Sequence, residues 1–278
     1  MSILGRERSA PSSMANPLYG SASRRVERTV TSMQPPATPP GLARSTLREE
    51  ILVVLALSLL ASAVYAVLSL LSAPLKGVSV ASVNQSNELA RQVVGIAFSL
   101  APVWLVVHLL RRSGEGVGAI GLAWDRPGRD VRVGMAFFVV VGLGGLGVYL
   151  AAVALGVNRF VVPVPPLGRW WTVPVLLLNA AAAGLLEEVI VLGYLVTRLR
   201  QLAWSPFAAV AASALLRGAY HLYQGWGGFA GNLAMGVLFG VAFLRLRRTW
   251  PFVIAHVLLD AAAGIGFIAF RHHLPGFS

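Results

Sequence analysis

A series of apolar stretches, each about twenty residues long, runs through this chain and limits the folds open to it. The stretches cover roughly residues 51–71, 89–110, 133–157, 173–196, 206–223, 229–244 and 251–270. A helix of about 20 residues spans the hydrocarbon core of a bilayer, which is about 30 Å thick. Of the 278 residues, 56% are hydrophobic and 12% are charged, whereas about 25% are charged in a typical soluble domain. The sequence therefore predicts an all-α polytopic membrane helix bundle with about seven transmembrane helices.

The polar segments between these stretches divide the chain into four parts. Residues 1–50 are rich in Ser, Pro and Arg, and such a segment cannot bury enough apolar surface to offset the entropy of ordering. We therefore predict a disordered basic tail over 1–50, N-terminal transmembrane helices over 51–171, a functional core of four helices over 172–270, and a C-terminal tail over 271–278. The chain has no Cys, which excludes disulfides and thiol nucleophiles.

The net charge of +12 is carried mainly by Arg residues in the tail and in alternate loops. This asymmetry fits the positive-inside rule and contact with anionic lipids, so nucleic acid is not an expected partner. We predict an integral membrane protein of the plasma membrane with a cytoplasmic N-terminus. The sequence does not specify the oligomeric state.

Two adjacent carboxylates, Glu187 and Glu188, interrupt the fourth apolar stretch. A charged side chain at bilayer depth costs about 3 kcal/mol on insertion scales, and intramembrane ionisable residues usually mark a functional site. The alternative is structural: one ion pair, or carboxyl groups kept neutral to hydrogen-bond a neighbouring helix. The adjacent pair favours the functional interpretation.

Further ionisable residues lie in later apolar stretches at a spacing of four. These are Arg217 with His221, and His256 with Asp260. Because a helix turns once in about 3.6 residues, each pair shares one helix face. The pattern predicts that three helices surround one cavity lined by acids and imidazoles.

Two kinds of hydrolysis fit this set of side chains. A carboxylate can take a proton from water while imidazoles stabilise the oxyanion that forms when water attacks a peptide carbonyl. Alternatively, Glu187, His221, His256 and Asp260 could hold a zinc ion, which would itself acidify the water. Asp260 could also orient His256.

These motifs, read in order, resemble the CPBP (Abi, or CAAX-protease-like) family of intramembrane proteases. The resemblance covers roughly residues 172–269, and the family includes type II CAAX prenyl endopeptidases and bacterial relatives proposed in bacteriocin self-immunity. It implies that Glu187 activates water, that His221 and His256 stabilise the oxyanion or bind metal, and that Asp260 fills the last motif position. The residues that carry it are Glu187-Glu188, Gly193-Tyr194, His221 to Gly225, Gly231-Asn232 and His256 to Asp260.

The chain departs from the family pattern, EExxxR followed by FxxxH and HxxxN or HxxxD, at two positions. Leu192 stands where the first motif has Arg, and Arg217 stands where the second has Phe. We hypothesise that the two have exchanged places, so that Arg217 neutralises Glu188 from a neighbouring helix. The alternative is that Arg217 only extends to the membrane interface and the site is degenerate.

Two further observations concern the last motif and the depth of the site. The amide of an Asn can donate a hydrogen bond to an oxyanion, whereas an ionised Asp260 only accepts, which favours metal ligation or orientation of His256.

Counted from the Arg-rich ends of their helices, His221 lies much deeper than His256. A shared site therefore requires offset or tilted helices, or a turn inside the membrane near residues 224–228.

Three functions are compatible with the sequence. The first is an intramembrane endopeptidase, with Glu187, Glu188, Arg217, His221, His256 and Asp260 as site residues and a peptide or membrane-anchored protein as substrate. The second is a proton-coupled transporter, in which intramembrane acids and imidazoles relay protons, although no internal repeat is visible. The third is a non-catalytic immunity or scaffold protein.

Overall fold

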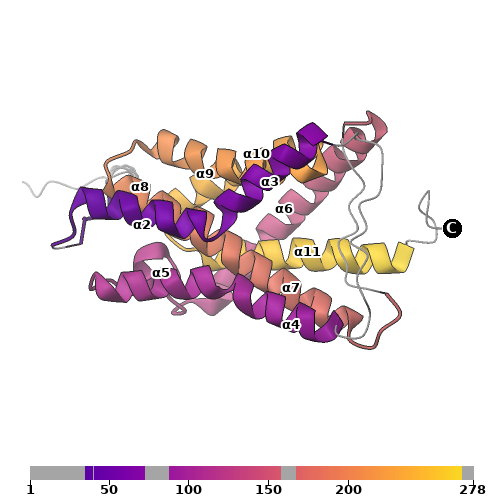
Figure 1. The fold of residues 1–278 in the computed structure, drawn as a ribbon, viewed down its shortest axis with the longest axis horizontal. Coiled ribbons are helices and arrows are strands. Elements are labelled where there is room, and N and C mark those ends of the chain that lie inside the picture. The colour runs from indigo at the N-terminus through magenta and orange to yellow at the C-terminus, as the bar shows by residue number, and fades with distance from the viewer. Residues whose placement is uncertain (1–34, 40, 73–87, 158–166, 271–278) are drawn as a thin grey trace, which may run out of the picture. The chain divides into compact units, whose positions relative to one another are not determined.

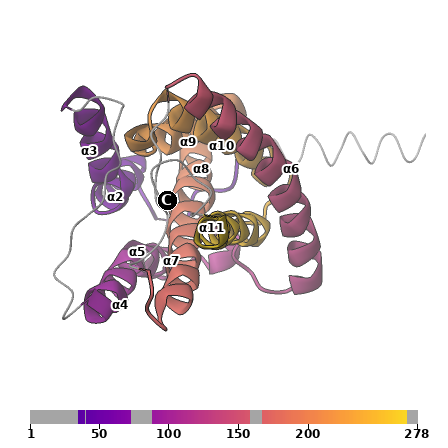
Figure 2. The same ribbon diagram turned by 90° about the vertical axis from the view of Figure 1, so that its right-hand side faces the viewer.

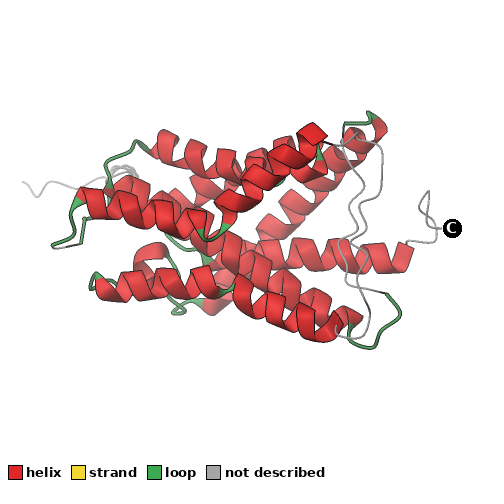
Figure 3. Ribbon diagram, in the orientation of Figure 1, coloured by secondary structure: helices red, strands yellow, loops and turns green. Residues whose placement is uncertain are grey.

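The computed structural model describes residues 35–39, 41–72, 88–157 and 167–270, and this part of the chain consists of helices and loops without a strand (Figure 3). The predicted all-α class is confirmed. The predicted C-terminal tail lies outside the described residues, as do residues 73–87 and the first 34 residues. The helices, shown in Figure 1, are α2 (Arg44–Ala56), α3 (Leu59–Ser72), α4 (Glu88–Ser99), α5 (Ala101–Arg112), η2 (Val117–Ile120), α6 (Pro127–Ala154), α7 (Thr172–Glu187), η3 (Glu188–Tyr194), α8 (Leu195–Gln201), α9 (Pro206–Tyr220), η4 (Leu222–Gln224), α10 (Trp226–Leu246) and α11 (Trp250–Phe270).

Five helices among the described residues are long and apolar enough to cross a membrane. They coincide with five of the seven predicted stretches, so the assignment to the membrane is confirmed, while the total of about seven stays a prediction. The five are Glu88–Arg112, Pro127–Ala154, Thr172–Gln201, Trp226–Leu246 and Trp250–Phe270.

The first predicted stretch is divided between two shorter helices, α2 and α3. The hydroxyl of Ser58 donates to the carbonyl of Val54 at 2.6 Å, and such bonds bend helices because they compete with the backbone ladder. Helix α2 begins at Arg44 instead of about residue 51, so the last part of the predicted disordered tail is helical. The reason is an apolar face that starts upstream, since Leu47 and Ile51 are buried one turn apart.

Helix α9 ends earlier than predicted and does not span a bilayer alone. It has 15 residues, which gives about 22 Å at 1.5 Å per residue. Ser205 caps its start by accepting a hydrogen bond from the amide of Ala208 at 3.1 Å. Beyond Tyr220 the chain turns through η4 and Gly225, whose φ of +100° strongly favours glycine. The turn predicted to resolve the depth of His221 therefore exists, and it begins at His221 itself.

Arg residues at one end of the bundle form ion pairs with acidic residues of neighbouring loops and helix ends. Arg198 donates to Glu115 at 2.5 Å. Arg248 makes two hydrogen bonds of 2.6 Å with Asp130 and one of 2.8 Å with Asp125. The hydrogen bond from Arg248 lowers the pKa of Asp125. The Arg-rich segments after α5, before α6, in α8 and between α10 and α11 thus share one end, as the positive-inside rule predicts; which side of the membrane that end faces stays a prediction.

Glycines allow the close helix contacts that assemble the centre of the bundle. A Cβ on Gly184 of α7 would lie 2.8 Å from Cγ2 of Val257 on α11, and α7 lies beside α11 in Figure 2. A Cβ on Gly236 would lie 2.8 Å from the Cα of Ala214, and α9 contacts α10 there. The GxxxG spacing of Gly236 and Gly240 therefore serves packing.

We expect Gly184→Val to destabilise the protein and to lower any activity, because α7 and α11 must move apart. Overpacking of this kind costs about 1–3 kcal/mol. Gly144→Val on α6 is the matched control, since nothing lies within 4 Å of its added Cβ. Thermal unfolding in detergent measures both variants, and equal melting temperatures would contradict the close contact of α7 with α11.

Candidate active site

The paired glutamates stand where an α-helix becomes a π-helix. Helix α7 ends at Glu187, and η3 continues from Glu188 as a π-helix, although the sequence predicts one continuous α-helix. The hydroxyl of Ser213 donates to the carbonyl of Val191 at 2.8 Å and so satisfies a backbone group of this wider helix. A Cβ on Gly193 would lie 2.9 Å from Oγ1 of Thr249. The π-helix is thus held by its neighbours, and such segments are frequent at functional sites.

Glu188 is fully buried and is held from two sides. Its Oε1 accepts hydrogen bonds of 2.7 Å from Nη2 of Arg217 on α9 and of 2.7 Å from Nδ1 of His256 on α11. Removing one partner of such a buried pair strands the other charge, so the three side chains depend on one another. Glu188 therefore joins three helices at one point.

Glu187 lies next to this group but reaches a more open position, with 13% of its side chain exposed. Its Oε2 accepts a hydrogen bond of 2.7 Å from the hydroxyl of Tyr220 and one of 3.3 Å from Nη1 of Arg217. Among the described residues, no hydrogen bond uses its other oxygen, Oε1. Glu187 is thus oriented by two donors while one carboxylate oxygen stays available.

Arg217 occupies the position predicted by the exchange hypothesis. It contacts both glutamates, only 1% of its side chain is exposed, and its guanidinium lies 5.9 Å from the ring centre of Phe239. It therefore does not extend to the interface. Leu192, where the family has Arg, is 1% exposed and belongs to the apolar core. Arg217 thus forms ion pairs from α9 with both glutamates, as the exchange hypothesis requires.

His256 and Asp260 contact each other one helical turn apart on α11. Nε2 of His256 lies 3.5 Å from Oδ2 of Asp260 and 4.0 Å from Oε2 of Glu187. Asp260 has 45% of its side chain exposed, so it lies at the opening of the site. The predicted pairing of these two residues on one helix face is present.

His221 stands slightly apart from the other site residues. Its Nδ1 lies 3.0 Å from the backbone carbonyl of Arg217, which requires an N–H at Nδ1. The ring lies next to Tyr220, with centres 4.7 Å apart, and close to parallel with Tyr223, at 6.1 Å and 25°. Among the described residues, no direct hydrogen bond joins His221 to Glu187 or to His256. The neutral ring therefore presents a lone pair at Nε2.

The zinc ion that the sequence allows does not fit the arrangement of the described side chains. No group of three His, Asp or Glu residues among them is placed to hold a metal ion. Glu187 and Glu188 both face the guanidinium of Arg217, and a cation there would be repelled. The zinc site stays a prediction without support from this geometry.

Tyr220, which the sequence does not single out, contacts the central cluster of Glu187, Glu188, Arg217, His256 and Asp260, whereas Asn232 does not. Tyr220 stands three residues after Arg217, a spacing that places both on one helix face, and it donates to Glu187. Only that spacing could have indicated it. Asn232 donates to the backbone carbonyl of Gly228 in its own helix at 2.9 Å, so it serves α10 and not the cavity.

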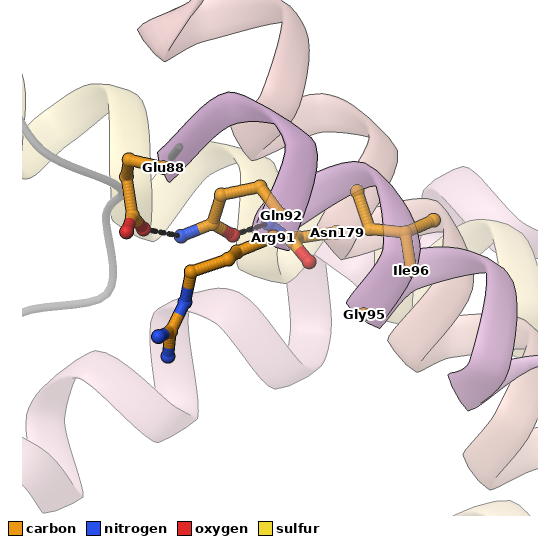
Figure 4. Close-up of a pocket in the computed structure, with 6 residues that line it drawn as sticks. All are labelled: Glu88, Arg91, Gln92, Gly95, Ile96 and Asn179. Atoms are coloured by element: carbon orange, nitrogen blue, oxygen red, sulfur yellow. Dashed lines mark hydrogen bonds between the residues drawn. The ribbon is translucent and has the colours of Figure 1, made fainter. Parts of the chain in front are cut away.

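A second polar group lies between α4 and α7, outside the cluster around Glu187 (Figure 4). Asn179 donates to Gln92 at 3.3 Å, and Gln92 donates to Glu88 at 2.8 Å. These side chains line a cavity of about 220 Å³ together with Arg91, Gly95 and Ile96. These hydrogen bonds connect α4 to α7 and involve no residue of the central cluster.

Comparison with known families supports the resemblance seen in the sequence. Residues 169–262 match the family described as type II CAAX prenyl endopeptidase Rce1-like, and this segment holds every residue of the central cluster. No significant match was found among curated proteins or among solved structures. The match supports a peptidase with peptide or membrane-protein substrates. Residues 169–262 of this integral membrane protein are therefore similar to the Rce1-like type II CAAX prenyl endopeptidases, the resemblance that their motifs predicted.

Proposed function

We propose that this chain is an intramembrane endopeptidase in which Glu187 activates water. The observation that carries the proposal is the state of Glu187: two donors orient its Oε2, and Oε1 stays available in a partly exposed position. A general base needs this combination of fixed geometry and an open lone pair. The family match to residues 169–262 supports the same class of reaction.

The reaction follows from these contacts. Glu187 takes a proton from water as the oxygen attacks the carbonyl carbon of the scissile peptide bond. The tetrahedral intermediate then collapses, the C–N bond breaks, and the proton held by Glu187 passes to the leaving amine. Glu188 and Arg217 act as positioning residues: they fix His256 and the Oε2 of Glu187. Water and amide give one carboxylic acid and one amine.

Substrate would enter at the most exposed side chains of the candidate site. Asp260 on α11 and Tyr223 in η4 have about half of their surface open, at 45% and 41%. A peptide, or the end of a membrane-anchored protein, that reached this opening would bring its carbonyl next to Glu187 and His256. Prenylated substrates are suggested only by the family.

Cleavage of a panel of fluorogenic peptides by the detergent-purified protein tests this function. We expect cleavage by the wild type and a kcat lower by about 10²- to 10⁴-fold for Glu187→Gln. Stable protein that cleaves nothing would favour a scaffold or immunity role. Proton flux into proteoliposomes that depends on Glu187, without cleavage, would favour the transporter.

Removal of metal should leave the cleavage rate unchanged. The described side chains provide no set of three metal donors, so the proposed steps use only groups of the chain. The measurement is peptide cleavage before and after dialysis against a chelator. Activity that disappears on chelation and returns with zinc would show that a metal is required.

A further inference from the structure

The oxyanion of the proposed reaction needs hydrogen-bond donors, and most donors near Glu187 are already engaged. Arg217 donates to both glutamates. The hydroxyl of Tyr220 donates to Glu187 at 2.7 Å. A donor bound to a carboxylate in the resting site must leave that carboxylate before it can bind a developing charge.

The imidazoles offer little more. The Nδ1–H of His221 is directed to the carbonyl of Arg217, so its neutral ring offers only a lone pair at Nε2. His256 uses Nδ1 for Glu188, and its Nε2 faces Asp260 and Glu187. An ionised Asp260 accepts only, whereas the Asn that the family pattern allows at this position can donate. One donor is missing from the expected set.

Tyr223 has a hydroxyl proton that none of the hydrogen bonds among the described residues uses. Its oxygen accepts a hydrogen bond of 3.0 Å from Nε2 of Gln224, and a phenol that accepts one bond still has its own proton to donate. The ring lies nearly parallel to that of His221, with centres 6.1 Å apart. Tyr223 is 41% exposed, whereas the nearby Tyr220 is buried and already donates to Glu187.

The turn around Tyr223 explains how its orientation is maintained. Tyr223 belongs to the 3-10 turn η4, which Gly225 closes with a hydrogen bond of 2.8 Å to the carbonyl of Leu222. A Cβ on Gly228 would lie 2.5 Å from Cβ of Gln224, so Gln224 is confined as well. The donor that holds the phenol oxygen is thus fixed by the backbone.

We propose that Tyr223 donates its hydroxyl proton in a hydrogen bond to the oxyanion and so replaces the amide donor that Asp260 cannot supply. The proposal rests on the proposed endopeptidase function. In this role Tyr223 is a catalytic residue, because its hydroxyl contacts the reacting oxygen. The bond strengthens as negative charge develops, so it lowers the barrier more than it tightens substrate binding.

Tyr223→Phe tests the proposal because it keeps the ring against His221 and removes only the hydroxyl. We expect kcat to fall by about 10²- to 10³-fold, the usual loss for one oxyanion donor, with KM and melting temperature close to wild type. Tyr149→Phe makes the same chemical change on α6 and should leave kcat unchanged. Asp260→Asn in the Tyr223→Phe background should restore part of kcat, because the new amide can donate.

The outcomes separate this inference from the function on which it rests. If Glu187→Gln has the lowered kcat while Tyr223→Phe keeps the wild-type kcat, the hydroxyl is no donor and the endopeptidase remains. A loss that appears in KM alone would assign Tyr223 to substrate binding and overturn the proposal. If Glu187→Gln cleaves as fast as wild type, or the wild type cleaves nothing, both fail.

Discussion

Replacing Glu187 with Gln should lower kcat by about 10²- to 10⁴-fold, the range that a general base contributes. A glutamine still accepts the hydrogen bonds from Tyr220 and Arg217 but cannot take a proton from water. Because the Glu187 side chain is 13% exposed and Arg217 keeps its bond to Glu188, the melting temperature should hardly change. Peptide cleavage and thermal unfolding of the same preparation measure the two effects.

Glu188→Gln is the matched comparison, since it makes the same change one residue later. Glu188 is fully buried between Arg217 and His256, so its loss should lower the melting temperature together with kcat. The contrast between a purely kinetic variant and a destabilised one distinguishes the base from the positioning residue. Two variants with the same profile would contradict these roles.

Arg217→Phe should destabilise the protein by about 3–5 kcal/mol and abolish cleavage. Phe is the residue that the family pattern has here, yet in this chain it would leave Glu188 buried without its guanidinium partner. It would also remove one of the two donors that orient Glu187. Denaturant or thermal unfolding in detergent gives the stability, and peptide cleavage gives the activity.

Adding Leu192→Arg to Arg217→Phe should recover part of both losses, because it restores the family arrangement of the two residues. Leu192→Arg alone is the control, and it should destabilise the protein by placing an unpaired cation in the apolar core. Recovery will be incomplete, since Leu192 now belongs to the apolar core of a π-helix. A double variant as unstable and inactive as Arg217→Phe would refute the exchange.

The positions of the membrane helices and the residues of the central cluster could be predicted from the sequence. Apolar length places the five spans. The spacing of four places His256 and Asp260 on one face, and the cost of charge in a membrane singles out Glu187 and Glu188. Arg217 could be linked to Glu188 because Leu192 is uncharged, whereas the family pattern has Arg at that position. All these signals are local in the sequence or come from its motifs.

Other features depend on contacts between helices and could not be read from local patterns. In the π-helix η3, Val191 accepts a hydrogen bond from Ser213 on α9, and Thr249 lies against Gly193. Helix α9 ends early because the chain turns between His221 and Gly225. The apolar pattern alone predicts that the helix ends a few residues later. Tyr220 carried no signal of its own, since an aromatic residue near a helix end also suits the interface.

The role of His221 illustrates the same limit. The family resemblance implies oxyanion stabilisation or metal binding, yet the bond from Nδ1 to the carbonyl of Arg217 leaves the neutral ring only a lone pair. Which nitrogen carries the proton is set by a backbone group four residues earlier. A motif names the residue type, whereas the tautomer depends on the fold.

Hydrolysis of a peptide in isotopically labelled water tests the central claim most directly. The purified wild type should produce two fragments with one labelled oxygen in the new C-terminal carboxylate, and Glu187→Gln should produce them about 10²- to 10⁴-fold more slowly. This result would show that a water activated by Glu187 splits the amide bond. Fragments that form equally well with Glu187→Gln, or that carry no label, would contradict the account.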